Sequence, residues 1–297
     1  MRSPVRAEPR NGASTSAARS ATERLERALL CSPAGGDFAG AGWRGTPDLE
    51  RLRRDHAAFA DVLAGLGVDV EIVPASDGLV DACFVYDPVL ATPAGYVELR
   101  MRKPVRQAEP AHLAGALEGL GIERLGSLTG DAVADGGDMF WLDDTTLAVA
   151  RGYRTNAAGH AQLAELLAPE GVSVERFDLP HAGGPSALLH LLSVISPVAE
   201  DLALVFEPLA PVSLLEALEE HGVRRLRCDP DELDGQGCNV LAVRPGVVVA
   251  ADTCPRTRRT LERAGCEVHV YPASELNKGA GGPTCLTLPV VRRGGAR

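Results

Sequence analysis

A cysteine and a histidine are the strongest candidates for chemistry in this sequence. Cys285 follows two glycines and a proline in the run GGPTCLTLP, which can hold a thiol rigidly on a short strand near the end of the chain. A thiolate nucleophile needs an acid/base partner, most often histidine. His190 lies in an apolar run without other charges, LLHLLSVIS, where burial is costly unless the imidazole has a task or a partner. His56 and three other histidines lie on expected helices among polar residues, which indicates surface positions. A buried inert cysteine and a satisfied core histidine remain open alternatives for Cys285 and His190.

Two pairs of carboxylates accompany this thiol and imidazole. Asp81 and Asp87 bracket the apolar run DACFVYD, an expected strand on which a separation of six residues puts both side chains on one face. Asp135 and Asp138 flank two glycines before another apolar run. Each aspartate alone is typical of an exposed turn. Together they predict an anionic pocket suited to a planar cation that donates two hydrogen bonds to a carboxylate.

The elements that must position these residues recur as a repeated unit. Each copy has an amphipathic helix, a glycine and a short alternating strand that ends near proline. The copies read LAGLGVDVEIVPA (63–75), LEGLGIERLGSLT (117–129), PEGVSVERFDLP (169–180), EEHGVRRLRCDP (219–230) and ERAGCEVHVYPA (262–273). Their glycines stand where a helix needs a left-handed C-terminal cap: Gly67, Gly121, Gly171, Gly222 and Gly265.

One or two further apolar runs precede each later helix, so the unit is ββαβ. Because such a unit cannot bury both of its faces alone, five of them are expected to close around an axis. The predicted fold is a five-bladed α/β propeller. The alternative, a doubly wound sheet, usually carries a glycine-rich phosphate loop after its first strand. The sequence has no such loop there, and the run GAGGP at 279–283 indicates a tight turn.

Composition limits the function classes. The 297 residues are 45% hydrophobic, and the formal net charge of -10 argues against a general nucleic-acid binder and favours a cationic small molecule. Seven scattered cysteines, without a CxxC pair or a cluster with histidine, predict no metal site and reduced thiols in a cytoplasm. No run approaches the ~20 apolar residues of a membrane span. We therefore expect a cytoplasmic protein with neither a nucleic-acid nor a membrane partner.

The chain divides into a tail and one domain. Residues 1–24 are rich in arginine, serine and alanine, which predicts a disordered N-terminal tail, with an organellar targeting peptide as the competing interpretation. Residues 25–297 are expected to form a single catalytic domain.

Six motifs, in chain order, resemble one enzyme family. DACFVYD, VRQAE, DGGD, RTNAAG, LLHLLS and GGPTCLTLP are similar to motifs of the dimethylarginine dimethylaminohydrolases and their relatives, the arginine deiminases and amidinotransferases. The similarity covers about residues 28–292, and the ordered set is far more specific than any one motif. It implies the pentein fold, which is a five-bladed α/β propeller around a central active site, and hydrolysis of a guanidino group without a cofactor or a metal.

The resemblance also implies roles for individual residues. Cys285 corresponds to the nucleophile, His190 to the general acid and base, and Asp135 to the family's catalytic carboxylate. The remaining positions correspond to substrate-binding residues: Asp81, Phe84, Asp87, Arg106 and Arg154. Of these, the two arginines correspond to those that hold the substrate α-carboxylate.

Three functions remain open. The first is hydrolysis of dimethylarginine to citrulline and dimethylamine. The second is deimination or dihydrolysis of free arginine, which the deiminase-like C-terminal third favours (GCNVLAVRPG, SELNKGAGGPTCLTLP). Tyr86 stands where close dimethylarginine hydrolases carry glutamate, and this difference keeps the choice open. The third is a non-catalytic guanidino binder, against which an intact Cys285 and His190 argue. A small arginine-like molecule is the expected partner, and a homodimer stays open.

Overall fold

The computed structural model describes residues 19–185 and 189–293, which form five three-stranded sheets and five α-helices. The first unit joins both ends of the chain: β1 (Arg24–Cys31), α1 (Leu49–Gly65), β2 (Asp69–Val73) and β15 (Leu288–Arg293). The second has β3 (Val89–Thr92), β4 (Gly95–Glu98), α2 (Glu109–Gly119) and β5 (Arg124–Ser127). The third has β6 (Met139–Trp141), β7 (Thr146–Arg151), α3 (Ala157–Leu167) and β8 (Ser173–Asp178). The fourth has β9 (Ile195–Ala199), β10 (Leu202–Val205), α4 (Val212–Glu220) and β11 (Arg224–Arg227). The fifth has β12 (Leu241–Arg244), β13 (Val247–Ala251), α5 (Pro255–Arg263) and β14 (Glu267–Tyr271).

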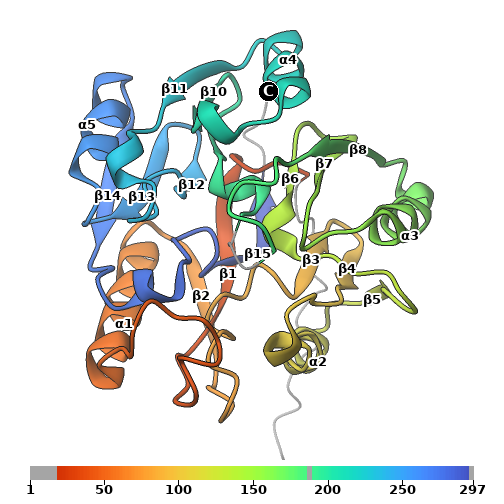
Figure 1. Ribbon diagram of the computed structural model, residues 1–297, viewed down its shortest axis with the longest axis horizontal. Coiled ribbons are helices and arrows are strands. Elements are labelled where there is room, and N and C mark those ends of the chain that lie inside the picture. Colours follow the sequence, from red (N-terminus) through yellow and green to blue (C-terminus); the bar gives the residue numbers. More distant parts are fainter. Residues whose placement is uncertain (1–18, 186–188, 294–297) are drawn as a thin grey trace, which may run out of the picture.

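Every unit has the same topology. An antiparallel pair is followed by the helix, which returns the chain to a strand that pairs parallel with the middle one. In the first unit the antiparallel partner of β1 is β15, so the last strand completes the first sheet. The five sheets surround an axis and the helices lie on the outside of the ring (Figure 1). The predicted fold, a five-bladed α/β propeller of ββαβ units, is confirmed.

The five predicted cap glycines explain why each helix turns into a strand. All five have positive φ, between 69° and 93°. Only glycine adopts this left-handed conformation without a Cβ penalty, and it ends the helix while directing the chain back toward the sheet. The strand that follows is an edge strand of its sheet in every unit, and most of its side chains are exposed or half-buried.

Two local predictions were wrong. Residues 81–87 form successive turns rather than a strand, with Phe84 N bonded to Asp81 O at 2.9 Å and Tyr86 N to Cys285 O at 3.1 Å. Cys285 likewise lies in a turn that ends before β15 begins. Both segments are apolar because they are buried at the axis, and their backbone groups bond to turns instead of to a neighbouring strand.

A third expectation, a surface position for His56, was also wrong. His56 is buried in α1 on the same face as Leu52 and Phe59, and burial lowers its pKa to about 4. Its neighbour Asp55 is buried as well, whereas Arg53 and Arg54 are exposed.

Residues 1–18 of the predicted tail lie outside the described residues, whereas its last residues contact the domain. Arg19 Nη2 donates to Glu170 O at 2.7 Å, Thr22 is buried, and β1 already begins at Arg24. No helix in the described ranges combines the length and apolar character that a bilayer span requires.

Candidate active site

A polar side chain from each blade meets the others at the axis. Asp87, Asp135, His190, Asn239 and Cys285 each lie in the turn that precedes the first strand of the antiparallel pair, namely β3, β6, β9, β12 and β15. Because these strands surround the axis, the turns before them converge at one end of the ring. The repeat therefore brings together residues from five distant parts of the sequence.

These turns enclose a cavity of about 130 Å³. Lys103 and the backbone of residues 279–281 form part of its wall. Seven of the eight predicted site residues also line it: Asp81, Phe84, Asp87, Arg106, Arg154, His190 and Cys285. The eighth, Asp135, is fully buried and lies against His190. The sulfur and the imidazole that the sequence separates by 95 positions thus line the same small space.

Carboxylates surround the His190 imidazole. Its Nε2 is 3.4 Å from Asp135 Oδ2 and its Nδ1 is 3.9 Å from Asp87 Oδ1. Burial lowers the pKa of His190, but Asp135, Asp138 and Asp87 together outweigh burial and hold it above its ordinary value of 6.5. Burial works against ionisation of Asp135 as well, and the His190 interaction reverses this, so its pKa is lowered. Both shifts favour an imidazolium that faces a carboxylate, which is the form that can donate a proton.

Asp138 lies next to the His190–Asp135 pair and fixes the backbone beside His190. It is fully buried, accepts from Thr155 Oγ1 at 2.7 Å and from Leu191 N at 3.2 Å, and so fixes the turn after His190. Burial raises the pKa of Asp138 to about 6, although His190 and Thr155 act to lower it.

Arg106 has a different environment from the one expected of a substrate carboxylate holder. Its guanidinium is buried and donates to Glu109 Oε2 at 2.8 Å, Asp87 Oδ2 at 2.5 Å and Phe84 O at 3.1 Å. With Gly137 N donating to the other Asp87 oxygen at 2.9 Å, this network fixes the orientation of Asp87. Arg154 is the less committed arginine, with one bond of 3.1 Å to Asp135 and a partly exposed side chain.

Asp81 connects the cavity to the loop of residues 41–43, which covers one side of the cavity. It accepts from Trp43 Nε1 at 2.6 Å and from Lys103 Nζ at 2.5 Å, and Lys103 also donates to Ala41 O. The glycine backbone at 279–281 packs against Phe84, since a Cβ at Gly281 would lie 2.3 Å from the ring. Sequence reasoning missed Lys103, which is an unremarkable lysine in MRKPVR until the fold brings it to the cavity.

Asn239 was also missed as a site residue. Its Nδ2 donates to Cys285 Sγ at 3.3 Å, and its Oδ1 accepts from Thr284 N at 3.0 Å. The amide thus holds both the thiol and the turn that carries it. The signal in the sequence was its position before the fifth-blade strand, which is equivalent to those of Asp87 and His190.

The Cys285 thiol is held in its neutral form in this state of the site. Burial raises its pKa to about 12 with help from the Asp87 charge, while Gly282, Asn239 and Arg106 act in the opposite direction. Because the thiolate is the nucleophile, the free protein should be protected against alkylation at neutral pH.

We expect iodoacetamide to label Cys285 more slowly than a free cysteine at pH 7.5, with a rate that still rises about tenfold per pH unit above pH 9. Mass spectrometry of the peptide that contains residue 285 gives the rate. Guanidinium chloride at non-denaturing concentration should accelerate labelling, because a bound cation favours the thiolate, whereas sodium chloride at equal ionic strength should not. A rate that levels off near pH 7 would contradict the assignment.

Known proteins resemble this chain in sequence and in structure. The arginine deiminase family model matches residues 210–292, the segment that contains Asn239 and Cys285. Arginine deiminase of Rhodococcus erythropolis (strain PR4 / NBRC 100887) is 30% identical over 190 residues, which are 54% of this chain and 47% of that protein. The chain spans about half the length of the curated arginine deiminases it matches. An uncharacterized protein of Bacillus subtilis (strain 168), YkgA, is 25% identical over 80% of this chain and 79% of its own.

Two groups of solved structures share the fold. Dimethylarginine dimethylaminohydrolase from Pseudomonas aeruginosa, solved with citrulline, has a TM-score of 0.75 at 22% identity and covers 89% of this chain and 99% of its own. The N-terminal domain of ArgZ, a cyanobacterial arginine dihydrolase solved with substrate, has a TM-score of 0.78 at 20% identity and covers 90% and 98%. The chain thus shares its five-bladed fold with dimethylarginine dimethylaminohydrolase and the ArgZ domain, and its sequence is similar to part of the arginine deiminases, including the segment that carries Asn239 and Cys285.

Proposed function

We propose that this protein hydrolyses the guanidino group of an arginine-like amino acid, with Cys285 as nucleophile and His190 as general acid and base. One observation supports this above the rest: a thiol, an imidazole whose pKa is raised by neighbouring carboxylates, and the carboxylates of Asp81 and Asp87 line one small cavity. A guanidinium is planar and cationic, so carboxylates can hold it in one orientation while the sulfur approaches its central carbon.

The proposed reaction has two halves. In the first, the Cys285 thiolate forms a C–S bond to the guanidinium carbon, and the C–N bond to the leaving amine breaks as His190 gives that nitrogen its proton. In the second, water adds to the S-alkylthiouronium carbon and loses a proton to His190. The C–S bond then breaks, the remaining hydroxyl proton leaves to solvent, and a ureido product and the thiolate result. General acid and base catalysis of this kind contributes about 10²–10⁴-fold in rate.

Substrate binding supplies the thiolate in this scheme. In the free site burial and Asp87 hold the thiol neutral. A guanidinium that binds between Cys285 and Asp87 adds a positive charge next to the sulfur and neutralises the repelling carboxylate, and both effects lower the Cys285 pKa. The nucleophile therefore ionises when its target is present.

Arg154 is the proposed holder of the substrate α-carboxylate, because it lines the cavity and has only one carboxylate contact, Asp135. For Arg106 we propose a positioning role instead, since its nitrogens are engaged by Glu109, Asp87 and Phe84. Phe84 and Asp81 complete the wall and its connection to the covering loop.

For the substrate we propose dimethylarginine first, on the motifs DACFVYD and YRTN, which resemble those of the dimethylarginine hydrolases. Arginine is the second candidate, favoured by the arginine deiminase match over 210–292. The tyrosine at position 86 does not argue against dimethylarginine as the substrate. Its side chain lines a separate cavity and does not line the one that contains Cys285. Assays with both substrates separate them: citrulline with dimethylamine supports the first, and ammonia release from arginine supports the second.

Gly137 offers a test of the site geometry apart from its chemical groups. A Cβ at Gly137 would lie 2.4 Å from His190 Nδ1 and 2.7 Å from Asp87 Oδ1, so alanine must displace one of them. We expect Gly137→Ala to lower kcat/KM by about 10²-fold, since displacement of a catalytic group by about 1 Å has that cost. Steady-state kinetics on the preferred substrate measures it.

The matched control is Gly115→Ala in α2, where a Cβ meets nothing within 4 Å. It should leave kinetics unchanged and raise stability by about 1 kcal/mol, because alanine is the better helix former. Equal kinetics for the two variants would contradict the proposed arrangement of His190 and Asp87.

A further inference from the structure

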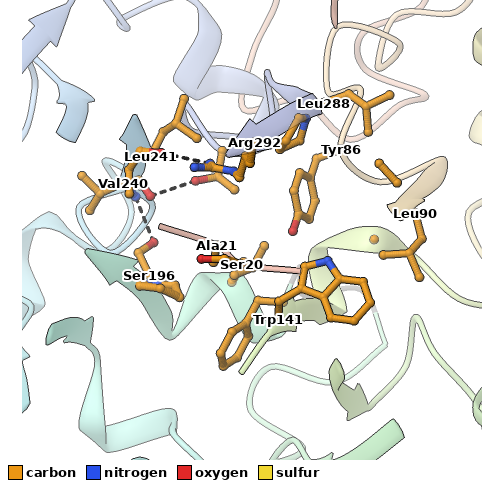
Figure 2. A pocket seen from close by; sticks show the side chains of 18 of the residues that line it. Ser20, Ala21, Tyr86, Leu90, Trp141, Ser196, Val240, Leu241, Leu288 and Arg292 are labelled. Carbon is orange, nitrogen blue, oxygen red and sulfur yellow. Dashed lines mark hydrogen bonds between the residues drawn. The ribbon is translucent and has the colours of Figure 1, made fainter. Parts of the chain in front are cut away.

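A second cavity lies on the propeller axis, separate from the active-site cavity. It has a volume of about 60 Å³ and is lined by residues of β3, β6, β9, β12 and β15, with Ser20 and Ala21 at one side. Figure 2 shows this cavity, which we call the axial cavity. No residue lines both it and the cavity of Cys285. Its ceiling consists of the chain neighbours of site residues: Tyr86 beside Asp87, and Thr284 beside Cys285.

The walls of the axial cavity are mostly apolar. Leu90, Phe140, Trp141, Leu241 and Leu288 contribute side chains from four blades. Its hydroxyl groups are already engaged, because Tyr86 Oη donates to Met139 O at 3.2 Å and Ser196 Oγ donates to Cys238 O at 2.7 Å. Nothing in these walls compensates a charge.

Arg292 is the exception. This side chain of β15 is 4% exposed, and its nitrogen end points toward Leu241 of β12 (Figure 2). It donates to two backbone carbonyls, Glu23 O at 2.5 Å and Ala242 O at 2.9 Å. No carboxylate of the described residues lies within the 4.0 Å ion-pair distance of its guanidinium. Burial lowers the pKa of Arg292 to about 10, with Tyr86 and the more distant Glu23 charge acting in the opposite direction.

A buried cation that is bonded only to neutral carbonyls is costly unless an anion accompanies it. A guanidinium matches the geometry of a carboxylate, which it binds through two parallel hydrogen bonds. The apolar walls suit a short hydrocarbon chain, and about 60 Å³ has room for roughly four or five waters, hence for an acid of similar heavy-atom count.

We propose that the axial cavity is a binding site for a short aliphatic monocarboxylate, with Arg292 as the anion-binding residue. Entry is from the side of Ser20 and Ala21, where the axial cavity shares walls with a larger one of about 310 Å³. The site is independent of the proposed catalysis, because it needs neither Cys285 nor His190.

The test measures binding of acetate, propionate and butyrate to the full chain by calorimetric titration and by thermal melting, at constant ionic strength. The melting temperature should rise with ligand concentration by about 2–4 °C near saturation. Affinity should rise about fourfold from acetate to propionate, since the added methylene buries apolar surface, and it should not rise further for butyrate, which exceeds the size of the cavity. Propionamide, which keeps the shape and lacks the charge, should give no shift. If chloride raised the melting temperature as much as propionate does, the site would bind any small anion, and the proposal would be overturned.

Two matched variants locate the ligand. Arg292→Met should abolish the propionate shift, whereas Arg293→Met, its neighbour on β15 with an exposed side chain paired to Glu26, should preserve it. Loss of the shift in Arg154→Gln instead would assign the acid to the active-site cavity and overturn the proposal. If Arg292→Met fails to fold, the comparison of propionate with propionamide in the unaltered chain still decides, because equal effects contradict recognition by the guanidinium.

Discussion

Replacement of Cys285 by serine is expected to lower turnover by about 10⁴–10⁶-fold while the protein still binds its substrate. A serine hydroxyl is isosteric with the thiol but ionises far less readily, and His190 is a poor base for it because its raised pKa favours the protonated form. The Asn239 amide can donate to an oxygen as it does to Cys285 Sγ, so the turn should keep its shape. Single-turnover kinetics gives the rate, and equilibrium titration with substrate gives the affinity.

The same experiment separates an enzyme from a guanidino binder. A non-catalytic binder would show no turnover before or after the substitution and would keep its affinity. Retained turnover in Cys285→Ser would contradict a covalent step at this residue. Cys266→Ala is the matched control, because this cysteine is buried in the outer part of the fifth blade, next to α5, and does not line the cavity. Acid quenching during turnover should trap a substrate adduct on Cys285 in the unaltered chain, detected by mass spectrometry, and none in Cys285→Ser.

The fold was predictable because its signals are local. A helix that ends at a left-handed glycine and returns as an alternating strand leaves a pattern within about 13 residues, and five such patterns predict five blades. The closing step, in which β15 pairs with β1, follows from the repeat because the first unit lacks one strand. No long-range information was needed to reach the topology.

The turns at the axis were not predictable in the same way. DACFVYD is as apolar as a buried strand, and only its contact with Cys285 O, nearly 200 residues later, shows that its backbone bonds elsewhere. Sequence patterns report burial, and a buried turn and a buried strand bury similar side chains. Asp81 and Asp87 still reach the cavity, but through turns that the alternation argument did not foresee.

The contacts that each polar side chain makes were the second feature that the sequence did not predict. The arginine type at position 106 suits a substrate carboxylate, yet Glu109 and Asp87 already surround it. Lys103 has no distinguishing neighbours in the sequence, and Asn239 is marked only by its position before the first strand of a blade. Their roles come from contacts with Asp81 and Cys285, which lie 22 and 46 positions away. Residue types indicate what a side chain can bind, whereas the fold decides which partner is within reach.

His190→Asn should lower kcat by about 10³–10⁴-fold, because the amide can donate a hydrogen bond but cannot deliver a proton to the leaving amine or accept one from water. The affected step is protonation of the departing amine. A substrate analogue whose leaving amine has a lower pKa needs this protonation less, so it should recover part of the lost rate. His269→Asn, at an exposed position paired with Glu267, is the matched control and should stay within about twofold of the unaltered protein.

The pH dependence of stability provides a second measurement on His190→Asn. Because the folded-state pKa of His190 is raised above 6.5, its protonated form contributes stability that is fully present below pH 6.5 and is lost as pH rises through the folded-state value. The difference in unfolding free energy between the unaltered chain and His190→Asn should therefore be largest in mild acid and shrink toward pH 9. Denaturant titrations at each pH measure it. A difference that grows with pH would mean that the imidazole is neutral in the folded site, and it could not then be the acid that protonates the departing amine.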